Sequence, residues 1–260
     1  MKEYSTKNIR NVALVSHSSS GKTILTEAFL HFTGATTRMG KITEGNTVAD
    51  FDEEETRRQI SLYTSVVPIE YKNIKINFLD TPGYTDFVGE LISAVDVADS
   101  AIVMVDAVSG FEVGTEIAWN YCNKFKLPRF LVINKMDRDN ADYQKALTSV
   151  QEFSDSRLIP VQIPWIEEAD FKGVIDLLTM QAYTGDGKTS EEIPADFTEA
   201  ADSAHLALIE VAAEGDDVLL EKYLDGVELS ADEIDKGLAS IILSGTYVLV
   251  FVAARGAEIG

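Results

Sequence analysis

The first half of the sequence alternates short apolar runs with stretches of helical spacing, and this order limits the folds open to the chain. The apolar run Val12–Val15 precedes a helical pattern over Thr23–Phe32. The same order recurs with the later runs "IKINFLD", "AIVMVDA" and "RFLVIN", and with helical patterns near residues 85–98, 114–125 and 142–153. Such alternation predicts an α/β fold, in which helices cover both faces of a mostly parallel sheet.

Two segments of the first half break this order. "SLYTSVVPIEY" and "IKINFLD" predict a β-hairpin that turns at Lys72-Asn73. Residues Gly34–Ile60 are polar and acidic without a sustained period, and they predict a long loop. A loop of that length is expected in a compact domain only where it has a function.

The pattern changes near residue 156. Short strand candidates, "VQIP", "GVIDLL" and "MQAY", are followed by a Gly185-Asp186-Gly187 turn and by helical stretches after Asp196, near Asp217–Leu224 and after the capping box of Ser230 and Glu233. The run Tyr247–Ala253 returns to the pattern of the first half. We therefore predict a core over residues 1–155, an inserted α+β subdomain over 156–245, and a last strand with its loop over 246–260.

Composition narrows the possible functions. The formal net charge of the 260-residue chain is −21, which argues against direct nucleic-acid binding by this segment alone. A phosphate site built from main-chain amides and one lysine remains possible. The only cysteine is Cys122, so an intramolecular disulfide and a cysteine-based metal site are excluded. Without a signal peptide or an apolar run long enough to span a bilayer, we expect a cytoplasmic monomer that does not bind membranes.

The segment "SHSSSGKT" lies between a predicted strand and a predicted helix, as a phosphate-binding loop must. Amides around Gly21 would face phosphates, Lys22 would reach the β and γ oxygens, and the Thr23 hydroxyl would bind Mg²⁺. Ser16 replaces the usual first glycine, which would cost roughly 1–2 kcal/mol if its φ were positive. The candidate phosphate residues are Ser16, His17, Ser18, Ser19, Ser20, Gly21, Lys22 and Thr23.

A second motif, "DTPGY", follows the strand "IKINFL". Asp80 could hold Mg²⁺ through a water molecule, and the Gly83 N–H could meet a γ-phosphate oxygen. Gain or loss of that phosphate would then move the following segment. The candidate residues of this motif are Asp80, Thr81, Pro82, Gly83 and Tyr84.

A third motif, "NKMD", ends the next buried strand and contains Asn134, Lys135, Met136 and Asp137. The Asp137 carboxylate can accept both N1–H and the 2-amino group of guanine, a donor pair that adenine lacks. Facing adenine, the same carboxylate would be desolvated and unpaired, at a cost of several kcal/mol. Asn134 would bond the base edge or the phosphate loop, and the Lys135 stem would cover the base.

With these motifs, the chain resembles the N-terminal G domain of the elongation factor G family, most closely its elongation factor G-like (elongation factor G 2) branch. "RRQISL" resembles switch I, "DTPGYTDFVGE" switch II and "NKMDR" the guanine motif. "PVQIP", "FKGVIDLLTMQAY" and "EKYLDG" resemble the inserted G′ subdomain, so the implied fold is a P-loop G domain with that insertion. The resemblance implies that Ser61 supplies a second hydroxyl to Mg²⁺. It also implies that "VFVAARGAEIG" places the Ala253 or Ala254 amide at guanine.

The resemblance implies a ribosome-dependent GTPase, with GTP or GDP and Mg²⁺ as ligands, in translocation or ribosome disassembly. The catalytic candidates are Tyr84, Lys22 and Gly83. Tyr84 stands where the family usually has histidine, and a phenol of pKa ~10 is neutral at pH 7, so we expect slower hydrolysis and unchanged binding. The alternatives are a nucleotide-gated binding module with little hydrolysis, a P-loop ATPase or kinase, and a structural acidic domain.

Overall fold

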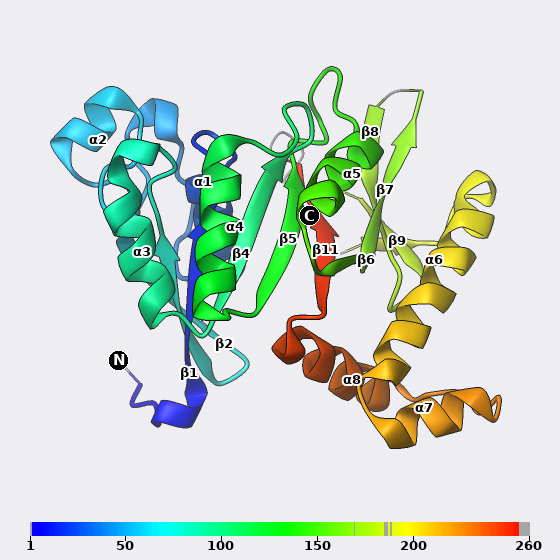
Figure 1. The fold of residues 1–260 in the computed structure, drawn as a ribbon. Helices are drawn as coiled ribbons and strands as arrows, with labels where there is room; N and C mark the ends of the chain where they lie inside the picture. Colours follow the sequence, from blue (N-terminus) through cyan, green and yellow to red (C-terminus); the bar gives the residue numbers. More distant parts are fainter. Residues whose placement is uncertain (1, 169, 185–186, 188, 255–260) are drawn as a thin grey trace. The chain divides into compact units, whose positions relative to one another are not determined.

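The computed structural model describes residues 2–168, 170–184, 187 and 189–254 (Figure 1). The chain divides into two compact units. Unit 1 contains Met1–Asp106 and Phe111–Leu127, and unit 2 contains Ala107–Gly110 and Pro128–Gly260. Within the described residues, no helix is both long enough and apolar enough to cross a membrane.

In unit 1 the strands lie in the order β2-β3-β1-β4, and α1, α3 and α4 pack against them. β1 pairs in parallel with β3 and β4, and β2 pairs antiparallel with β3. The elements of this unit are η1 (Thr6–Asn8), β1 (Ile9–Val15), α1 (Lys22–Phe32), η2 (Ile42–Glu44), α2 (Glu53–Arg58), β2 (Ser65–Tyr71), β3 (Ile74–Asp80), η3 (Thr85–Phe87), α3 (Val88–Val97), β4 (Ser100–Asp106) and α4 (Val113–Phe125).

The apolar residues of β1, β3 and α1 form the core that supports the loop between β1 and α1. Leu14, Leu30 and Phe78 are buried in one cluster, and the rings of Phe29 and Phe78 stack with centroids 4.6 Å apart. Since β1 ends and α1 begins in this core, the loop that joins them has fixed ends.

Unit 2 combines parallel strands in the order β5-β11-β6 with an antiparallel sheet in the order β10-β9-β8-β7. Apolar residues of β6, β7, β8, β11, α6 and α8 share one core. The elements of this unit are β5 (Arg129–Asn134), α5 (Tyr143–Phe153), β6 (Arg157–Pro160), β7 (Gln162–Glu167), β8 (Asp170–Asp176), β9 (Gln181–Thr184), β10 (Thr189–Glu191), α6 (Ala195–Glu214), α7 (Asp217–Leu224), α8 (Ala231–Ser244) and β11 (Tyr247–Val252).

The predicted α/β class is confirmed, with mostly parallel strands and a small inserted antiparallel sheet. The hairpin is also confirmed, because Lys72 and Asn73 both take positive φ (44° and 64°), as a type I′ turn requires. The capping box of Ser230 and Glu233 opens α8 as expected. Of the predicted 185–187 turn, Gly185 and Asp186 lie outside the described residues.

The prediction of a structureless loop over residues 34–60 was wrong, because α2 lies within it. Asp52 and Glu55 form a capping box at the start of this short helix, and Arg57 and Arg58 pair with Glu54 near its end. Local charge pairs and the cap therefore order a segment that has no apolar period. Two helix starts also differ by a few residues: a 3-10 turn precedes α3, and α6 begins at Ala195, so Asp196 lies inside its first turn.

Strand β2 lies at the end of the strand order in unit 1 and contains Pro68, which stands opposite Asn77 of β3. Proline has no main-chain N–H, so it is tolerated in a strand mainly at an edge, where the missing donor does not interrupt pairing.

Candidate functional site

The loop from Ser16 to Gly21 joins β1 to α1 in unit 1, and glycine or left-handed backbone makes its turn possible. Gly21 has φ 107° and Ser19 has φ 60°. The backbone strain considered for Ser16 does not occur there, because the left-handed residue is Ser19, at a cost of roughly 1–2 kcal/mol. Ser16 instead donates its hydroxyl to the Met104 carbonyl, which fixes the loop against β4.

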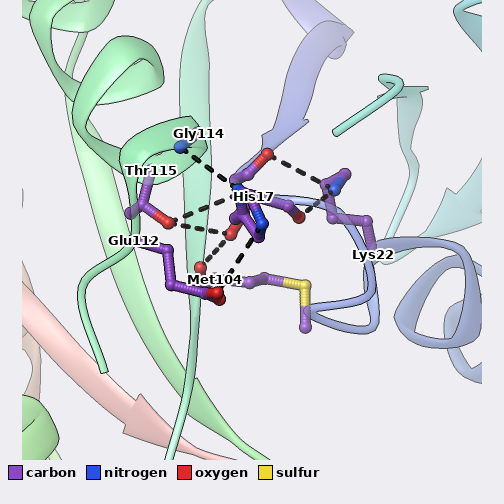
Figure 2. Close-up of polar contacts among 7 residues, drawn as sticks. His17, Lys22, Met104, Glu112, Gly114 and Thr115 are labelled. Atoms are coloured by element: carbon purple, nitrogen blue, oxygen red, sulfur yellow. Dashed lines mark hydrogen bonds and ion pairs between the residues drawn. The ribbon is translucent and has the colours of Figure 1, made fainter. Parts of the chain in front are cut away.

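The ammonium group of Lys22 is folded back onto this loop (Figure 2). Lys22 is 6% exposed, and its Nζ donates to the His17 carbonyl at 2.8 Å and lies 3.5 Å from the Ser16 carbonyl. Burial lowers its pKa to about 8, against the opposing effect of the Asp80 and Asp50 charges. A buried ammonium at the start of α1, beside main-chain amides, is suited to a polyanion.

Asp80, at the end of β3, is the least satisfied polar group of this region. It is 1% exposed, and neither of its carboxylate oxygens has a hydrogen-bond partner among the described residues. Burial raises the pKa of Asp80 to about 7, although the charge of Lys22 and the nearby Thr23 hydroxyl both lower it. A buried carboxylate without partners normally has a cation nearby, so Asp80 fits the metal role predicted for it.

Two hydroxyl groups lie close together at the start of α1. The Thr23 Oγ1 and Ser61 Oγ atoms are 3.3 Å apart, and Ser61 donates to Asp50 Oδ1 at 2.8 Å. Asp50 is 5% exposed, and burial raises its pKa. Hydroxyl and carboxylate oxygens are the ligands that Mg²⁺ prefers, so Thr23, Ser61 and Asp80 fit that ion.

His17 connects the loop to the start of α4, as Figure 2 shows. Its Nδ1 accepts the Gly114 N–H at 3.2 Å, and its Nε2 lies 3.6 Å from Glu112 Oε1. The His17 N–H donates to Thr115 Oγ1 at 3.3 Å. Since Nδ1 is an acceptor, this geometry selects the tautomer with its proton on Nε2.

Gly83 lies directly on the phosphate loop. A Cβ at this position would be 2.5 Å from the Ser18 nitrogen and 2.6 Å from the His17 carbonyl carbon and oxygen. Thr81, fully buried, donates both its hydroxyl and its N–H to the Leu14 carbonyl, at 2.6 Å and 3.3 Å. The residues predicted to sense a γ-phosphate thus contact the residues predicted to bind phosphates.

Tyr84 follows this anchored turn and is exposed. Its side chain is 41% exposed, and it lines a shallow pocket together with Pro82, Val88 and Leu91.

The base-binding candidates lie in unit 2 and are described within that unit. Asn134 ends β5, is 6% exposed, and accepts the Ala107 N–H at 2.9 Å through its carbonyl. Lys135 has φ 66°, which turns the chain, and Asp137 is exposed. A turn at a strand end that presents an exposed carboxylate is suited to an edge-on contact with a base.

The described part of the segment "VFVAARGAEIG", which is predicted to contact guanine, is bonded to this turn. The Met136 N–H donates to the Ala253 carbonyl at 3.3 Å, and the Ala253 N–H donates to the Ile133 carbonyl at 2.9 Å. Ala254 is buried. The structure therefore brings "NKMD" and Ala253 together, while residues 255–260 of the predicted motif lie outside the described residues.

The acidic run Asp50–Glu55 was expected to be a solvated part of switch I, but Asp50 and Glu55 are buried near the phosphate loop. Glu27, which the sequence prediction did not single out, is buried there as well. Glu55 Oε1 accepts the Leu62 and Tyr63 N–H groups at 2.9 Å and 3.1 Å, which holds the chain on the far side of Ser61. The capping-box spacing of Asp52 and Glu55 could have indicated α2. The burial of acids depends on main-chain amides from distant residues, which sequence spacing does not reveal.

Comparison with known proteins agrees with this geometry and confirms the fold as a P-loop G domain. Residues 7–235 match the family model described as the elongation factor Tu GTP-binding domain. A crystal structure of a protein from Thermus thermophilus matches 97% of this chain with a TM-score of 0.90 and 36% sequence identity, and this chain spans 38% of that one. The chain therefore belongs to the elongation factor Tu GTP-binding domain family.

Proposed function

We propose that this chain is the GTP-binding domain of an elongation factor G-like protein, which hydrolyses GTP to GDP and phosphate with Mg²⁺ on the ribosome. The observation that carries the proposal is the buried Asp80 carboxylate without hydrogen-bond partners among the described residues, in a region that also contains the Lys22 ammonium and the Thr23 hydroxyl. This combination is suited to a phosphate chain that carries a divalent cation.

The residues of unit 1 have distinct roles in this proposal. The amides from Ser18 to Thr23 bind the phosphates, and the Lys22 ammonium exchanges its bond to the His17 carbonyl for one to a phosphate oxygen. Thr23 and Ser61 would offer hydroxyl oxygens to Mg²⁺, and the Asp80 carboxylate would help to hold it. When bound, Mg²⁺ would neutralise charge that develops on the β and γ oxygens.

The residues of unit 2 select the base. Asp137, exposed after the left-handed turn at Lys135, accepts the two N–H groups of guanine, and the main chain at Ala253 and Ala254 contacts O6. An adenine nucleotide has no matching donors, so this proposal predicts binding of GDP over ADP. The P-loop ATPase or kinase alternative predicts binding of ADP instead.

The hydrolytic step depends on Gly83 and Tyr84. The Gly83 N–H bonds a γ-phosphate oxygen, and the Tyr84 hydroxyl orients the attacking water. A neutral phenol cannot supply the positive charge of an imidazolium, so its contribution is limited to orientation. The second candidate function is therefore a nucleotide-gated binding module with little hydrolysis, which a tyrosine at position 84 in place of the usual histidine favours.

Two measurements test the proposal. In the first, the melting temperature of the chain is measured in Mg²⁺ with GDP or with ADP, since a ligand that binds the folded state raises it. A rise with GDP and none with ADP is expected, with Asp137→Ala as the matched variant that loses the GDP effect. Equal shifts with both nucleotides, or none with either, would refute guanine binding.

In the second measurement, single-turnover phosphate release is followed with and without ribosomes, in the full-length protein that contains this domain. Release that ribosomes accelerate supports the GTPase. Nucleotide binding without release in either condition supports the binding module instead.

A further inference from the structure

Glu27 has a position that none of the three sequence motifs explains. It lies on α1, four residues after Thr23, and is 1% exposed. A buried carboxylate needs strong donors, because an unpaired one costs several kcal/mol. The N–H groups that Glu27 accepts belong to the segment before Asp50 and Ser61, which we call the metal-side residues.

Both carboxylate oxygens of Glu27 accept main-chain N–H groups of this segment. Oε2 accepts the Gly40 N–H at 3.0 Å, and Oε1 accepts the Val48 N–H at 2.6 Å. A Cβ at Gly40 would lie 2.4 Å from Glu27 Oε2 and 2.8 Å from the Thr47 Cα, so the close approach requires glycine. One side chain thus holds both ends of residues 40–48 against α1.

The segment leads directly to the metal-side residues. Val48 is followed by Ala49, which is fully buried in the core with Leu14 and Leu30, and then by Asp50. Asp50 accepts the Ser61 hydroxyl, which lies 3.3 Å from Thr23 Oγ1. Glu27 and Thr23, both on α1, are therefore connected through residues 40–48, Asp50 and Ser61.

We infer that Glu27 is a positioning residue that holds residues 40–48 on α1 and thereby places Asp50 and Ser61 beside Thr23. Glu27 touches neither the nucleotide nor the metal in this inference. Loss of its carboxylate would free the segment, and the Ser61 hydroxyl would no longer be held beside Thr23, where it would serve Mg²⁺. A triphosphate complex with Mg²⁺ would then weaken more than a diphosphate complex. The nucleotide part of this inference rests on the proposed function, whereas the structural part does not.

The first test measures the structural part without nucleotide. Trypsin can cleave after Arg38 and Lys41, which are both exposed and flank Gly40, but cleavage of an ordered segment requires local opening. The rate at these sites is compared in the wild-type chain, Glu27→Gln and Glu53→Gln, an exposed glutamate on α2 as control. We expect Glu27→Gln to be cleaved about tenfold faster, because the new amide NH₂ faces one of the N–H donors, and the control to match the wild type. Equal rates for a folded Glu27→Gln chain would overturn the inference.

A second variant tests the same contact in case Glu27→Gln does not fold. Gly40→Ala retains the carboxylate but places a methyl group 2.4 Å from it, and the same rise in cleavage is expected. An unchanged cleavage rate in this variant would also contradict the inference that Glu27 holds residues 40–48 on α1.

The last test measures the coupling to the ligand site. Dissociation constants for GDP and for the slowly hydrolysed analogue GTPγS are measured with Mg²⁺ in the same variants. We expect Glu27→Gln to lose about tenfold in preference for GTPγS with GDP affinity little changed, a split that general destabilisation would not produce. Faster cleavage with an unchanged preference would refute the coupling. If the wild-type chain bound neither nucleotide, the proposed function would fail, and the cleavage result would still decide the structural part.

Discussion

The substitution Gly83→Ala tests whether the segment after β3 reports on the terminal phosphate. The added Cβ would lie 2.5 Å from the Ser18 nitrogen, whereas ordinary contact begins at 3.4 Å. The segment at Gly83 and the phosphate loop must therefore separate by about 0.9 Å. Its three nearest atoms are all main-chain atoms of His17 and Ser18, which cannot rotate away. Overpacking of this kind costs about 1–3 kcal/mol, which leaves a domain folded.

The effect on binding follows from the same displacement. A hydrogen bond tolerates only a few tenths of an ångström, so the Gly83 N–H would no longer reach a γ-phosphate oxygen. A hydrogen bond to a charged group is worth about 1.5–3 kcal/mol, which corresponds to a loss of roughly 10- to 150-fold in affinity for GTPγS. GDP lacks that phosphate, so it loses only what the shift of the Ser18 amide costs, and its affinity should fall less than that of GTPγS.

Competition against a fluorescent guanine nucleotide in Mg²⁺ measures both constants. Gly89→Ala is the matched control, because nothing lies within 4 Å of a Cβ at that position of α3 and alanine favours a helix. The reasoning is wrong if Gly83→Ala keeps the wild-type ratio of the two affinities, or if GDP binding falls as far as GTPγS binding.

Further predictions concern Asp80, Asp137 and Tyr84. Because burial raises the pKa of Asp80 to about 7, its contribution to the free energy of unfolding is full below about pH 4 and is lost as the pH rises to about 7. The melting temperature of ligand-free Asp80→Asn relative to the wild type should therefore rise from about pH 5 to about pH 8, and a flat difference would contradict the assignment. Asp137→Asn should weaken GDP binding by about 10-fold or more and leave the melting temperature within about 2 °C, and retained GDP affinity would exclude its contact with the base. Tyr84→His should accelerate ribosome-stimulated phosphate release without changing GDP affinity, and a slower rate would show that the phenol is the better group.

The strand ends and the motifs that follow them could be predicted because they depend on local pattern. Lys22 opens its helix and Asp80 ends its strand, as the apolar runs on either side indicate. The buried acids could not be predicted in the same way. Glu27 and Glu55 are polar residues within ordinary helical sequence, and their burial is stable only because the amides of Gly40, Val48, Leu62 and Tyr63 converge on them. The strain considered for Ser16 was misplaced for a related reason, since its hydroxyl bond to Met104 depends on a strand that is distant in sequence.

Strand β2 has a consequence for the behaviour of this domain at high concentration. An outermost strand with free main-chain groups can recruit a strand from a neighbouring copy, the first step of fibrous aggregation. Pro68 removes one donor from that row, and two residues later Glu70 adds a charged side chain, whose carboxylate lies 3.8 Å from the Lys2 ammonium. Both features oppose growth from this edge, so replacement of Pro68 by a β-branched residue is the change most suited to convert a dispersed protein into one that assembles through its strands.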